Sequence, residues 1–278
     1  METVNLKHYC QRLFFISMIR KNKIKLIKSL SEKKYRLKEQ MFLIEGDKMV
    51  CEALGSPVRV RELYATAEFL HENSQLIVHA ETIIPSEKDD IRKMSLQKQP
   101  QNSLALCYLP QNLSLPEKID DFSLYLDGVQ DPGNLGTIIR TCDWFGMDSL
   151  YCSPDTADVY NPKVIQASMG SFCRVRIVYT EFAPLAQLAK QLNIPVIGTS
   201  LKGENLYDFQ LPASAIVILG NEGRGIRDHV ASQAGVYITV PSFSQNTTKA
   251  ESLNVATTAA IICSEARRRS SQQPSTQN

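Results

Sequence analysis

The second half of the chain alternates between short apolar runs and longer segments with helical spacing, and this alternation constrains the fold more than any other feature. The strand-like runs are 123–127, 150–153, 175–179, 194–199, 215–219 and 236–240. The helix-like segments between them are 135–145, 162–169, 183–192, 226–234 and 252–268. Strands that alternate with helices predict a parallel sheet with helices on both faces. The expected fold class is therefore α/β.

The first half of the chain predicts a smaller α/β unit. Its expected elements are a helix over 47–54, ended by Gly55-Ser-Pro57, and strands over 42–45, 58–65, 75–79 and 103–109. Residues 109–116 lose this periodicity and have proline near both ends, as a linker does. We expect five segments along the chain: an N-terminal extension (1–17), a first domain (18–109), a linker (110–120), a second domain (121–268) and a disordered Ser/Gln-rich tail (269–278).

Composition excludes several classes of function. The hydrophobic content of 43% is enough for a core, and the net charge of +2 favours no particular partner. Seven cysteines without a C-x-x-C pair argue against a disulfide framework and favour a reducing compartment, the cytoplasm. The four histidines are scattered, so we expect no metal site. The apolar run 13–19 is too short for a signal peptide or a membrane span.

Residues 18–40 are strongly basic, and two interpretations are open. Nine lysines and arginines face only Glu32 and Glu39 in this stretch. Such a cluster favours RNA binding, because neutralised phosphates release their condensed counterions. The alternative is the solvated face of a helix whose apolar side is Ile24, Leu26, Ile27 and Leu30. The segment alone gives the two interpretations about even weight.

The first of three informative loops follows the apolar run 124–126. Asp131-Pro-Gly-Asn134 predicts a turn, because proline restricts φ and glycine accepts positive φ. Asn134 is suited to cap the following helix or to serve as a site residue. Arg140 follows six residues later among apolar neighbours, so we expect it to be buried or to have a partner.

The second and third loops also follow apolar runs. Gly220-Asn-Glu-Gly-Arg-Gly225 has neither the P-loop nor the dinucleotide-binding pattern, but its glycines indicate close backbone approach. Glu222 within it could bind backbone N–H groups or contact a ligand. Val240-Pro241 ends the last run, and Ser252 is a natural N-cap with Asn254 inside the first turn. Since ligands bind beyond the carboxyl ends of parallel strands, the three loops predict one composite site.

These motifs resemble the SpoU (TrmH-like) class of RNA ribose 2′-O-methyltransferases, in the SPOUT superfamily. The resemblance covers about residues 121–268 and depends on Asn134 with Arg140, on 220–225, and on Pro241 with 252–254. The stretch 161–171 is similar as well. The basic N-terminal part resembles, less specifically, the substrate-binding domain of the family, which has a ribosomal-protein-like α/β fold.

The resemblance implies a C-terminal parallel-sheet domain with a deep trefoil knot, a homodimer, and S-adenosylmethionine as cofactor. It implies that the protein methylates a ribose 2′-hydroxyl in structured RNA, ribosomal or transfer. The implied cofactor-binding residues are Thr199, Gly220, Val240 and Leu253. The implied catalytic residues are Arg140, Asn134, Glu222, Ser252 and Asn254. Arginine is a poor proton acceptor, so for Arg140 we favour an electrostatic and positioning role over that of a base.

The third loop departs from the family pattern. Residues 242–251 contain no glycine, and the loop is a few residues longer than is common in the family. We expect this difference to affect cofactor affinity more than the class of reaction. It also leaves an alternative open, a catalytically inactive RNA-binding protein of the same fold. A nucleotide-dependent hydrolase or dehydrogenase is excluded, because both glycine fingerprints are absent.

Overall fold

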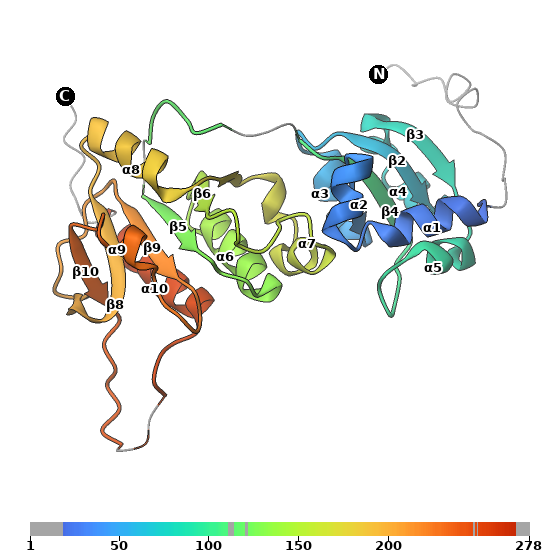
Figure 1. The fold of residues 1–278 in the computed structure, drawn as a ribbon. Coiled ribbons are helices and arrows are strands. Elements are labelled where there is room, and N and C mark those ends of the chain that lie inside the picture. Colours follow the sequence, from blue (N-terminus) through green and yellow to red (C-terminus); the bar gives the residue numbers. More distant parts are fainter. Residues whose placement is uncertain (1–18, 111–113, 120–121, 247, 249, 271–278) are drawn as a thin grey trace. The chain divides into compact units, whose positions relative to one another are not determined.

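The computed structural model describes residues 19–110, 114–119, 122–246, 248 and 250–270. These residues form two compact units, which Figure 1 draws in sequence colours. The first unit contains 19–110 together with Tyr160–Cys173, and the second contains 114–159 and 174–270. The expected extension 1–17 lies outside the described residues. Each unit has its own sheet and its own core.

The first unit is built on a four-stranded mixed sheet in the order β1-β4-β2-β3. Its strands are β1 (Met41–Glu45), β2 (Val60–Ala65), β3 (Ala80–Pro85) and β4 (Ser103–Tyr108). Its helices are α1 (Lys21–Ser29), α2 (Lys33–Glu39), α3 (Asp47–Leu54), α4 (Ala67–Glu72), α5 (Lys88–Met94) and the short η1 (Ile77–His79). Strand β4 pairs antiparallel with β1 and β2, and β2 pairs parallel with β3.

The strand expected over 75–79 is wrong. This stretch continues the turns that end α4, and Ile77–His79 forms a 3-10 helix before β3 begins at Ala80. The amides of Leu76 and Ile77 both bond the carbonyl of Asn73, which keeps the backbone coiled. Local hydrogen bonds therefore override the apolar pattern of the sequence. The strand is formed instead by the next six residues, as β3.

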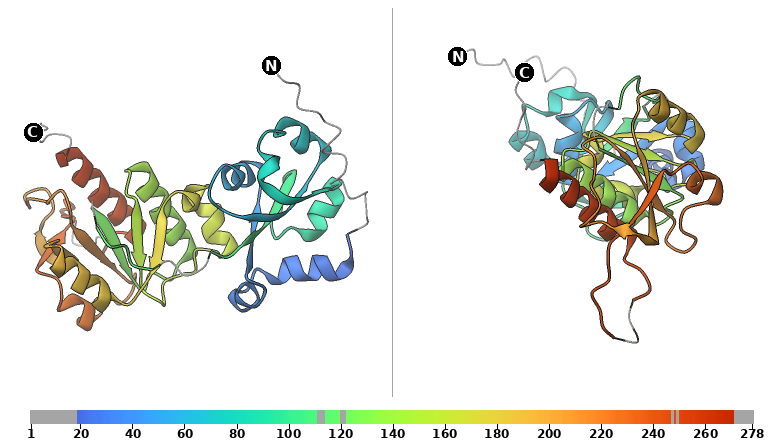
Figure 2. Two further views of the ribbon diagram at one scale, coloured as in Figure 1. Left: turned by 90° about the horizontal axis from the view of Figure 1, so that it is seen from above. Right: turned by 90° about the vertical axis from the view of Figure 1, so that its left-hand side faces the viewer.

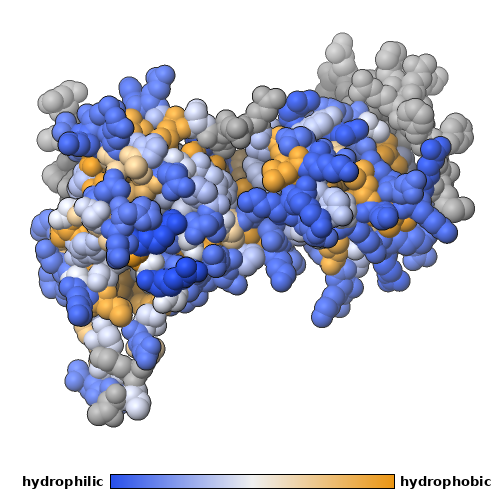
Figure 3. Space-filling view, viewed as in Figure 1, coloured by the Kyte–Doolittle hydropathy of each residue, from blue (hydrophilic) through white to orange (hydrophobic). Residues whose placement is uncertain are grey.

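In the basic segment 18–40 the helix with a buried apolar stripe is confirmed, and RNA binding stays a prediction. Ile27 and Leu30 are fully buried in the core, as the helical stripe predicts. Two of the cations are structural: Lys23 pairs with Glu62 at 2.6 Å, and Arg36, only 2% exposed, donates to the carbonyls of Leu30 and Ser31. The exposed cations that remain are Arg20, Lys21, Lys25, Lys28, Lys33, Lys34 and Lys38. Hydrophilic residues cover much of the face of the first unit that Figure 3 draws.

A segment from the second half of the chain, Tyr160–Cys173, packs with the first unit. Helix α7 (Pro162–Ser168) and the short η2 (Ser171–Cys173) belong to it. The ring of Phe42 on β1 lies 4.6 Å from that of Tyr160 and 6.2 Å from that of Phe172. A Cβ on Gly170 would come within 2.8 Å of the Glu52 side chain. These side chains are closely packed, so residues 160–173 form part of the core packing of the first unit.

The second unit is built on a six-stranded sheet in the order β10-β8-β9-β5-β6-β7, and every pair in it is parallel. The strands are β5 (Ser123–Asp127), β6 (Ser149–Cys152), β7 (Arg176–Tyr179), β8 (Val196–Asn205), β9 (Ile216–Gly220) and β10 (Val236–Thr239). The helices are α6 (Pro132–Trp144), α8 (Phe182–Gln191), α9 (Asp228–Ala231) and α10 (Val255–Ser270). The expected α/β class with a parallel sheet is confirmed. The trefoil knot implied by the resemblance stays a prediction.

Helices cover both faces of this sheet. One face carries α8 and α9, whose Phe182, Leu185 and Val230 join a core cluster with Tyr125 and Ile218. Helices α6 and α10 pack together on the other face, as the left view of Figure 2 shows. Because both faces are covered, all five residues of β5 are buried, which explains its continuous apolar run.

Three elements of the second unit have ends that differ from expectation. The expected helix 226–234 is only α9, because turns occupy the residues around it. Strand β8 runs on to Asn205, beyond the expected end at residue 199. Helix α10 begins at Val255 rather than Ser252 and includes Arg269, which was expected in the disordered tail. The Arg269 guanidinium donates to Glu265 and to the Tyr207 carbonyl at 2.6 and 2.8 Å, which holds the helix end.

Candidate active site

The three loops meet through side-chain hydrogen bonds. Asn134 donates from Nδ2 to Oε1 of Glu222 at 2.9 Å, across 88 residues of sequence. Its Oδ1 accepts from Nδ2 of Asn254 at 2.9 Å, across 120 residues. One asparagine therefore joins the second loop to the third, and its amide has a fixed orientation because it donates in one direction and accepts in the other.

Two different residues cap the helices that carry this network. Asp131 caps α6 and accepts from the amide of Asn134 at 2.8 Å, so the expected turn 131–134 is the first turn of the helix. Asn254 caps α10 by accepting from the amides of Ala256 and Thr257 at 2.9 and 3.3 Å. The expectation that Ser252 caps α10 is wrong. Capping by Asn254 explains an asparagine at this helix start, because its side chain bonds backbone N–H groups there.

Asn221, which the sequence did not single out, holds the second loop in shape. Its Oδ1 accepts from the amides of Gly223 and Arg224, and its Nδ2 donates to the Gly128 carbonyl at 2.7 Å. The loop-stiffening role considered for Glu222 thus belongs to its neighbour, while Glu222 contacts Asn134. Asparagine beside glycine after a strand is a signal for such a turn and could have identified it.

A buried ion pair also ties the first loop to the second. The Asp127 carboxylate is fully buried at the end of β5 and accepts from the backbone amide and Nε of Arg227, both at 2.7 Å. This bonding raises the pKa of the Arg227 guanidinium. Asp155 lies 3.4 Å from the same guanidinium, and its pKa is lowered, first by a hydrogen bond from Ser153 and then by Arg227. The pair therefore links the end of β5, where the first loop begins, to Arg227, just beyond the second loop.

Three of the predicted cofactor residues lie on or directly after neighbouring strands of the sheet. Val240 follows β10 and Gly220 ends β9, whereas Thr199 lies inside β8, directly after Gly198, the last residue of β8 that pairs with β9. The Thr199 hydroxyl donates to the Ile218 carbonyl at 2.8 Å. A Cβ on Gly220 would come within 2.3 Å of the Gly225 backbone, so only glycine fits there. The structure thus brings these three residues to one edge.

Two segments are candidates for contacts with the cofactor, residues 199–203 and Leu253. Residues 199–203 of β8 have no partner on β10. Tyr237 of β10 pairs with Gly198, and the next residue, Ile238, pairs with Glu204. The side chain of Leu253 is 48% exposed, and its backbone N–H and C=O make no hydrogen bond within the described part of the chain. Free backbone groups beside an exposed apolar side chain can bind the edge and the face of a purine ring.

Arg140 and Ser252 do not join the hydrogen-bond network. Arg140 is exposed on α6, so its expected burial is wrong, and it has no hydrogen bond or ion pair with any residue that the structure describes. Six residues correspond to about 9 Å of helix, and at about 100° per residue Arg140 faces a different side of α6 from Asn134. Ser252 is exposed and likewise makes no hydrogen bond with described residues.

The third loop extends away from the sheet. In Figure 1 and in the right view of Figure 2 the connection from β10 to α10 projects from the second unit. Residues 242–246 are exposed, and Phe243 keeps 77% of its surface in solvent. Its described residues make no backbone hydrogen bonds with the strand ends. The third loop, which is long and contains no glycine, is therefore open in its described residues.

No group of three His, Cys, Asp or Glu side chains among the described residues could hold a metal ion. No helix in the described ranges is long and apolar enough to cross a membrane.

Comparison with known proteins agrees with this geometry. The chain is 34% identical over 261 residues to the 23S rRNA (guanosine(2553)-2′-O)-methyltransferase RlmP of Bacillus subtilis, covering 89% of this chain and 96% of that protein. A solved TrmH-family structure from Porphyromonas gingivalis is 42% identical with a TM-score of 0.82, covering 91% and 100% of the two chains. The SpoU methyltransferase AviRb from Streptomyces viridochromogenes, solved with AdoMet, shares the fold with a TM-score of 0.80 at 23% identity, covering 91% and 99%.

Family models match both units. The MRM3-like substrate binding domain matches residues 21–105, in the first unit. The SpoU rRNA Methylase family matches residues 121–264, which include the three loops and their hydrogen-bond network. On this match and the full-length similarity to RlmP, the chain belongs to the SpoU rRNA methylase family.

Proposed function

We propose that this protein transfers the methyl group of S-adenosylmethionine to a ribose 2′-hydroxyl of ribosomal RNA. The hydrogen-bond chain from Glu222 through Asn134 to Asn254 carries this proposal, because it orients polar groups from three loops at one sheet edge. The similarity to RlmP over nearly the whole chain favours large-subunit rRNA over transfer RNA. Such a substrate is consistent with action in the cytoplasm.

Each candidate site residue has a proposed role. Bound S-adenosylmethionine supplies an electrophilic methyl group. Thr199, Gly220, Val240 and Leu253 would hold it through backbone and edge contacts at the strand ends. Asn134, Glu222 and Asn254 would position the ribose, because a poor nucleophile depends on alignment. Ser252 is proposed to help shape the same loop.

Arg140 is proposed to stabilise developing negative charge on the ribose oxygen. Its guanidinium is cationic, exposed, and free of protein partners among the described residues, so it can face the RNA. Because arginine does not give up its proton readily, we favour positioning and electrostatics over proton abstraction for Arg140.

We also propose that the protein is a homodimer. Trp144 ends α6 with 83% of its surface exposed, four residues from Arg140 on the same helical face. An exposed tryptophan of this kind is typical of an interface. Trp144→Asp should yield a monomer in sedimentation analysis. A wild-type chain that sediments as a monomer at all concentrations would contradict the dimer.

Methyl transfer from labelled S-adenosylmethionine to protein-free 23S rRNA tests the reaction. Arg140→Ala should lower kcat by roughly 10²–10³-fold, the usual cost of losing one group that stabilises an oxyanion. Cofactor binding, followed by calorimetry, should remain. Arg176→Ala is the matched control, because Arg176 begins β7 at the amino end of the sheet. Full activity of Arg140→Ala would refute its role, and no ribose methylation by the wild type would refute the reaction.

One observation bears on the alternative of an inactive RNA-binding protein. The described residues 242–246 after β10 are exposed, and the connection to α10 projects from the second unit. The calorimetric measurement separates the two functions: tight RNA binding without any heat from S-adenosylmethionine would favour the inactive protein.

A further inference from the structure

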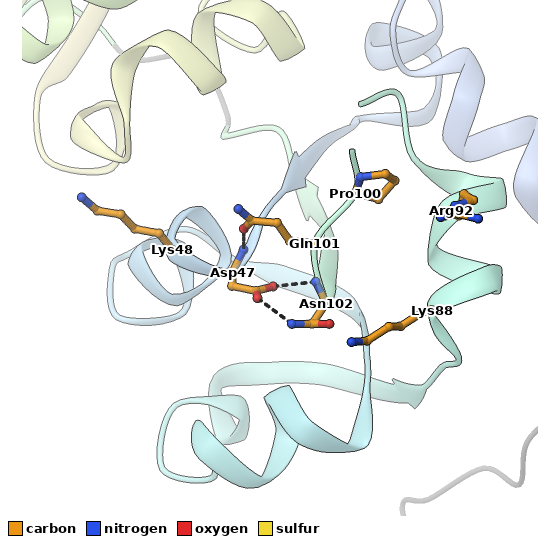
Figure 4. A pocket seen from close by; sticks show the side chains of 7 residues that line it. All are labelled: Asp47, Lys48, Lys88, Arg92, Pro100, Gln101 and Asn102. Carbon is orange, nitrogen blue, oxygen red and sulfur yellow. Dashed lines mark hydrogen bonds between the residues drawn. The ribbon is translucent and has the colours of Figure 1, made fainter. Parts of the chain in front are cut away.

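A cavity of about 560 Å³ lies within the first unit, between the start of α3, helix α5 and the segment that leads into β4. Its lining residues are Asp47, Lys48, Lys88, Arg92, Pro100, Gln101 and Asn102. Figure 4 shows Lys88 reaching from α5 toward Asn102, with Arg92 on the same helix near Pro100. The volume is in the range of sites that hold small organic molecules.

The wall of this cavity is held by Asp47. Its carboxylate accepts from the amide and the side-chain nitrogen of Asn102 at 3.0 and 3.1 Å, and from the hydroxyl of Ser103 at 2.8 Å. Its own amide donates to Oε1 of Gln101 at 2.6 Å. Hydrogen bonds within the wall therefore satisfy the negative charge of Asp47. They also fix the shape of the wall before any ligand binds.

The remaining charges of the lining are positive. Lys48, Lys88 and Arg92 are all exposed. Lys88 lies 3.8 Å from Glu68, and Arg92 lies 3.9 Å from Asp89, with both members of each pair well exposed. Ion pairs this long and this solvated contribute little, so the two cations can turn to a phosphate at small cost.

The wall also offers two amide groups for hydrogen bonding. The Oδ1 of Asn102 and the Nε2 of Gln101 make no hydrogen bond with other described residues, although the opposite end of each side chain is held by Asp47. One acceptor and one donor with restricted orientation can bind the edge of a nucleic-acid base. An anion-binding rim beside such groups fits a nucleotide better than a bare phosphate.

We propose that this cavity holds one unpaired nucleotide of the RNA substrate. Its phosphate would lie against Lys88 and Arg92, and its base edge against Gln101 and Asn102. A concave site of this kind requires a base that is not paired, since RNA duplexes are recognised by shape across the minor groove. The inference rests on the proposed function in one respect, that the substrate is RNA.

Filter binding of the full-length protein to protein-free 23S rRNA, at several salt concentrations, tests the site. The double variant Lys88→Gln/Arg92→Gln should bind roughly tenfold more weakly, with the salt slope reduced by about 1 for each lost cation. The control Lys93→Gln/Lys98→Gln removes the same charge from exposed positions outside the cavity lining. It should bind within about threefold of the wild type.

Competition separates a nucleotide site from general charge. Single-stranded RNA should displace the rRNA from the wild type better than blunt duplex RNA, and the double variant should lose this preference. Equal weakening by the two double variants, or equal competition by duplex RNA, would overturn the proposal. Methyl transfer at saturating rRNA should persist in the cavity variant. The two proposals fail separately: a wild type that transfers no methyl group refutes the proposed reaction, whereas the nucleotide site is judged by RNA binding alone.

Discussion

Replacing Asp127 with asparagine tests whether the ion pair between the first two loops stabilises the second unit. Asp127 is fully buried, and its carboxylate accepts from the backbone amide, Nε and a terminal nitrogen of Arg227. Asparagine has nearly the same volume, so the substitution removes charge and acceptor capacity and leaves packing almost unchanged. The change in unfolding free energy therefore measures the electrostatic contribution.

The expected magnitude follows from the surroundings of Arg227. Breaking a buried ion pair by removing one partner costs about 3–5 kcal/mol, because the other charge is left uncompensated. Arg227 keeps 38% of its side chain exposed and retains Asp155 at 3.4 Å, so solvent and a second carboxylate compensate part of the loss. We expect Asp127→Asn to lower the free energy of unfolding by about 3 kcal/mol, at the low end of that range.

Urea unfolding followed by far-ultraviolet circular dichroism measures this change. The control is Asp143→Asn in the same unit, where the carboxylate lies 2.8 Å from Arg174 but the two side chains are 25% and 45% exposed. An exposed pair of this kind contributes up to about 1 kcal/mol. If Asp127→Asn destabilises the protein no more than Asp143→Asn does, the buried pair does not hold the loops as argued.

Two further predictions concern the sheet edge and the last helix. Gly220→Ala should abolish calorimetric binding of S-adenosylmethionine, because a Cβ would lie 2.3 Å from the Gly225 backbone; wild-type affinity would contradict the close approach. Arg268 and then Arg269 lower the pKa of Glu265 to about 2, so its stabilisation is present above its usual pKa and is lost as pH falls toward 2. Glu265→Gln should therefore cost about 1–2 kcal/mol at pH 7 and almost nothing near pH 2. Equal cost at both pH values would exclude this ionic contribution.

The site could be predicted in part because several of its signals are local. Glycine, proline and asparagine after apolar runs mark loops at strand ends, and the fold class follows from the alternation of those runs. The sequence did not show which residues of the three loops form hydrogen bonds with one another. The N-cap expected at Ser252 lies at Asn254, and the stiffening role considered for Glu222 belongs to Asn221, because a choice between nearby polar residues depends on partners distant in sequence.

The sequence by itself determined the order of strands and helices, the polar groups available to the site, and the resemblance to a methyltransferase family. The tertiary structure decided that Asn134 binds both Glu222 and Asn254, that Arg140 is exposed, and that residues 160–173 pack with the first unit. The physical reason is the range of the interactions. Helix and turn propensities act over a few residues, whereas contacts across 88 and 120 residues exist only once the sheet has brought its strand ends together.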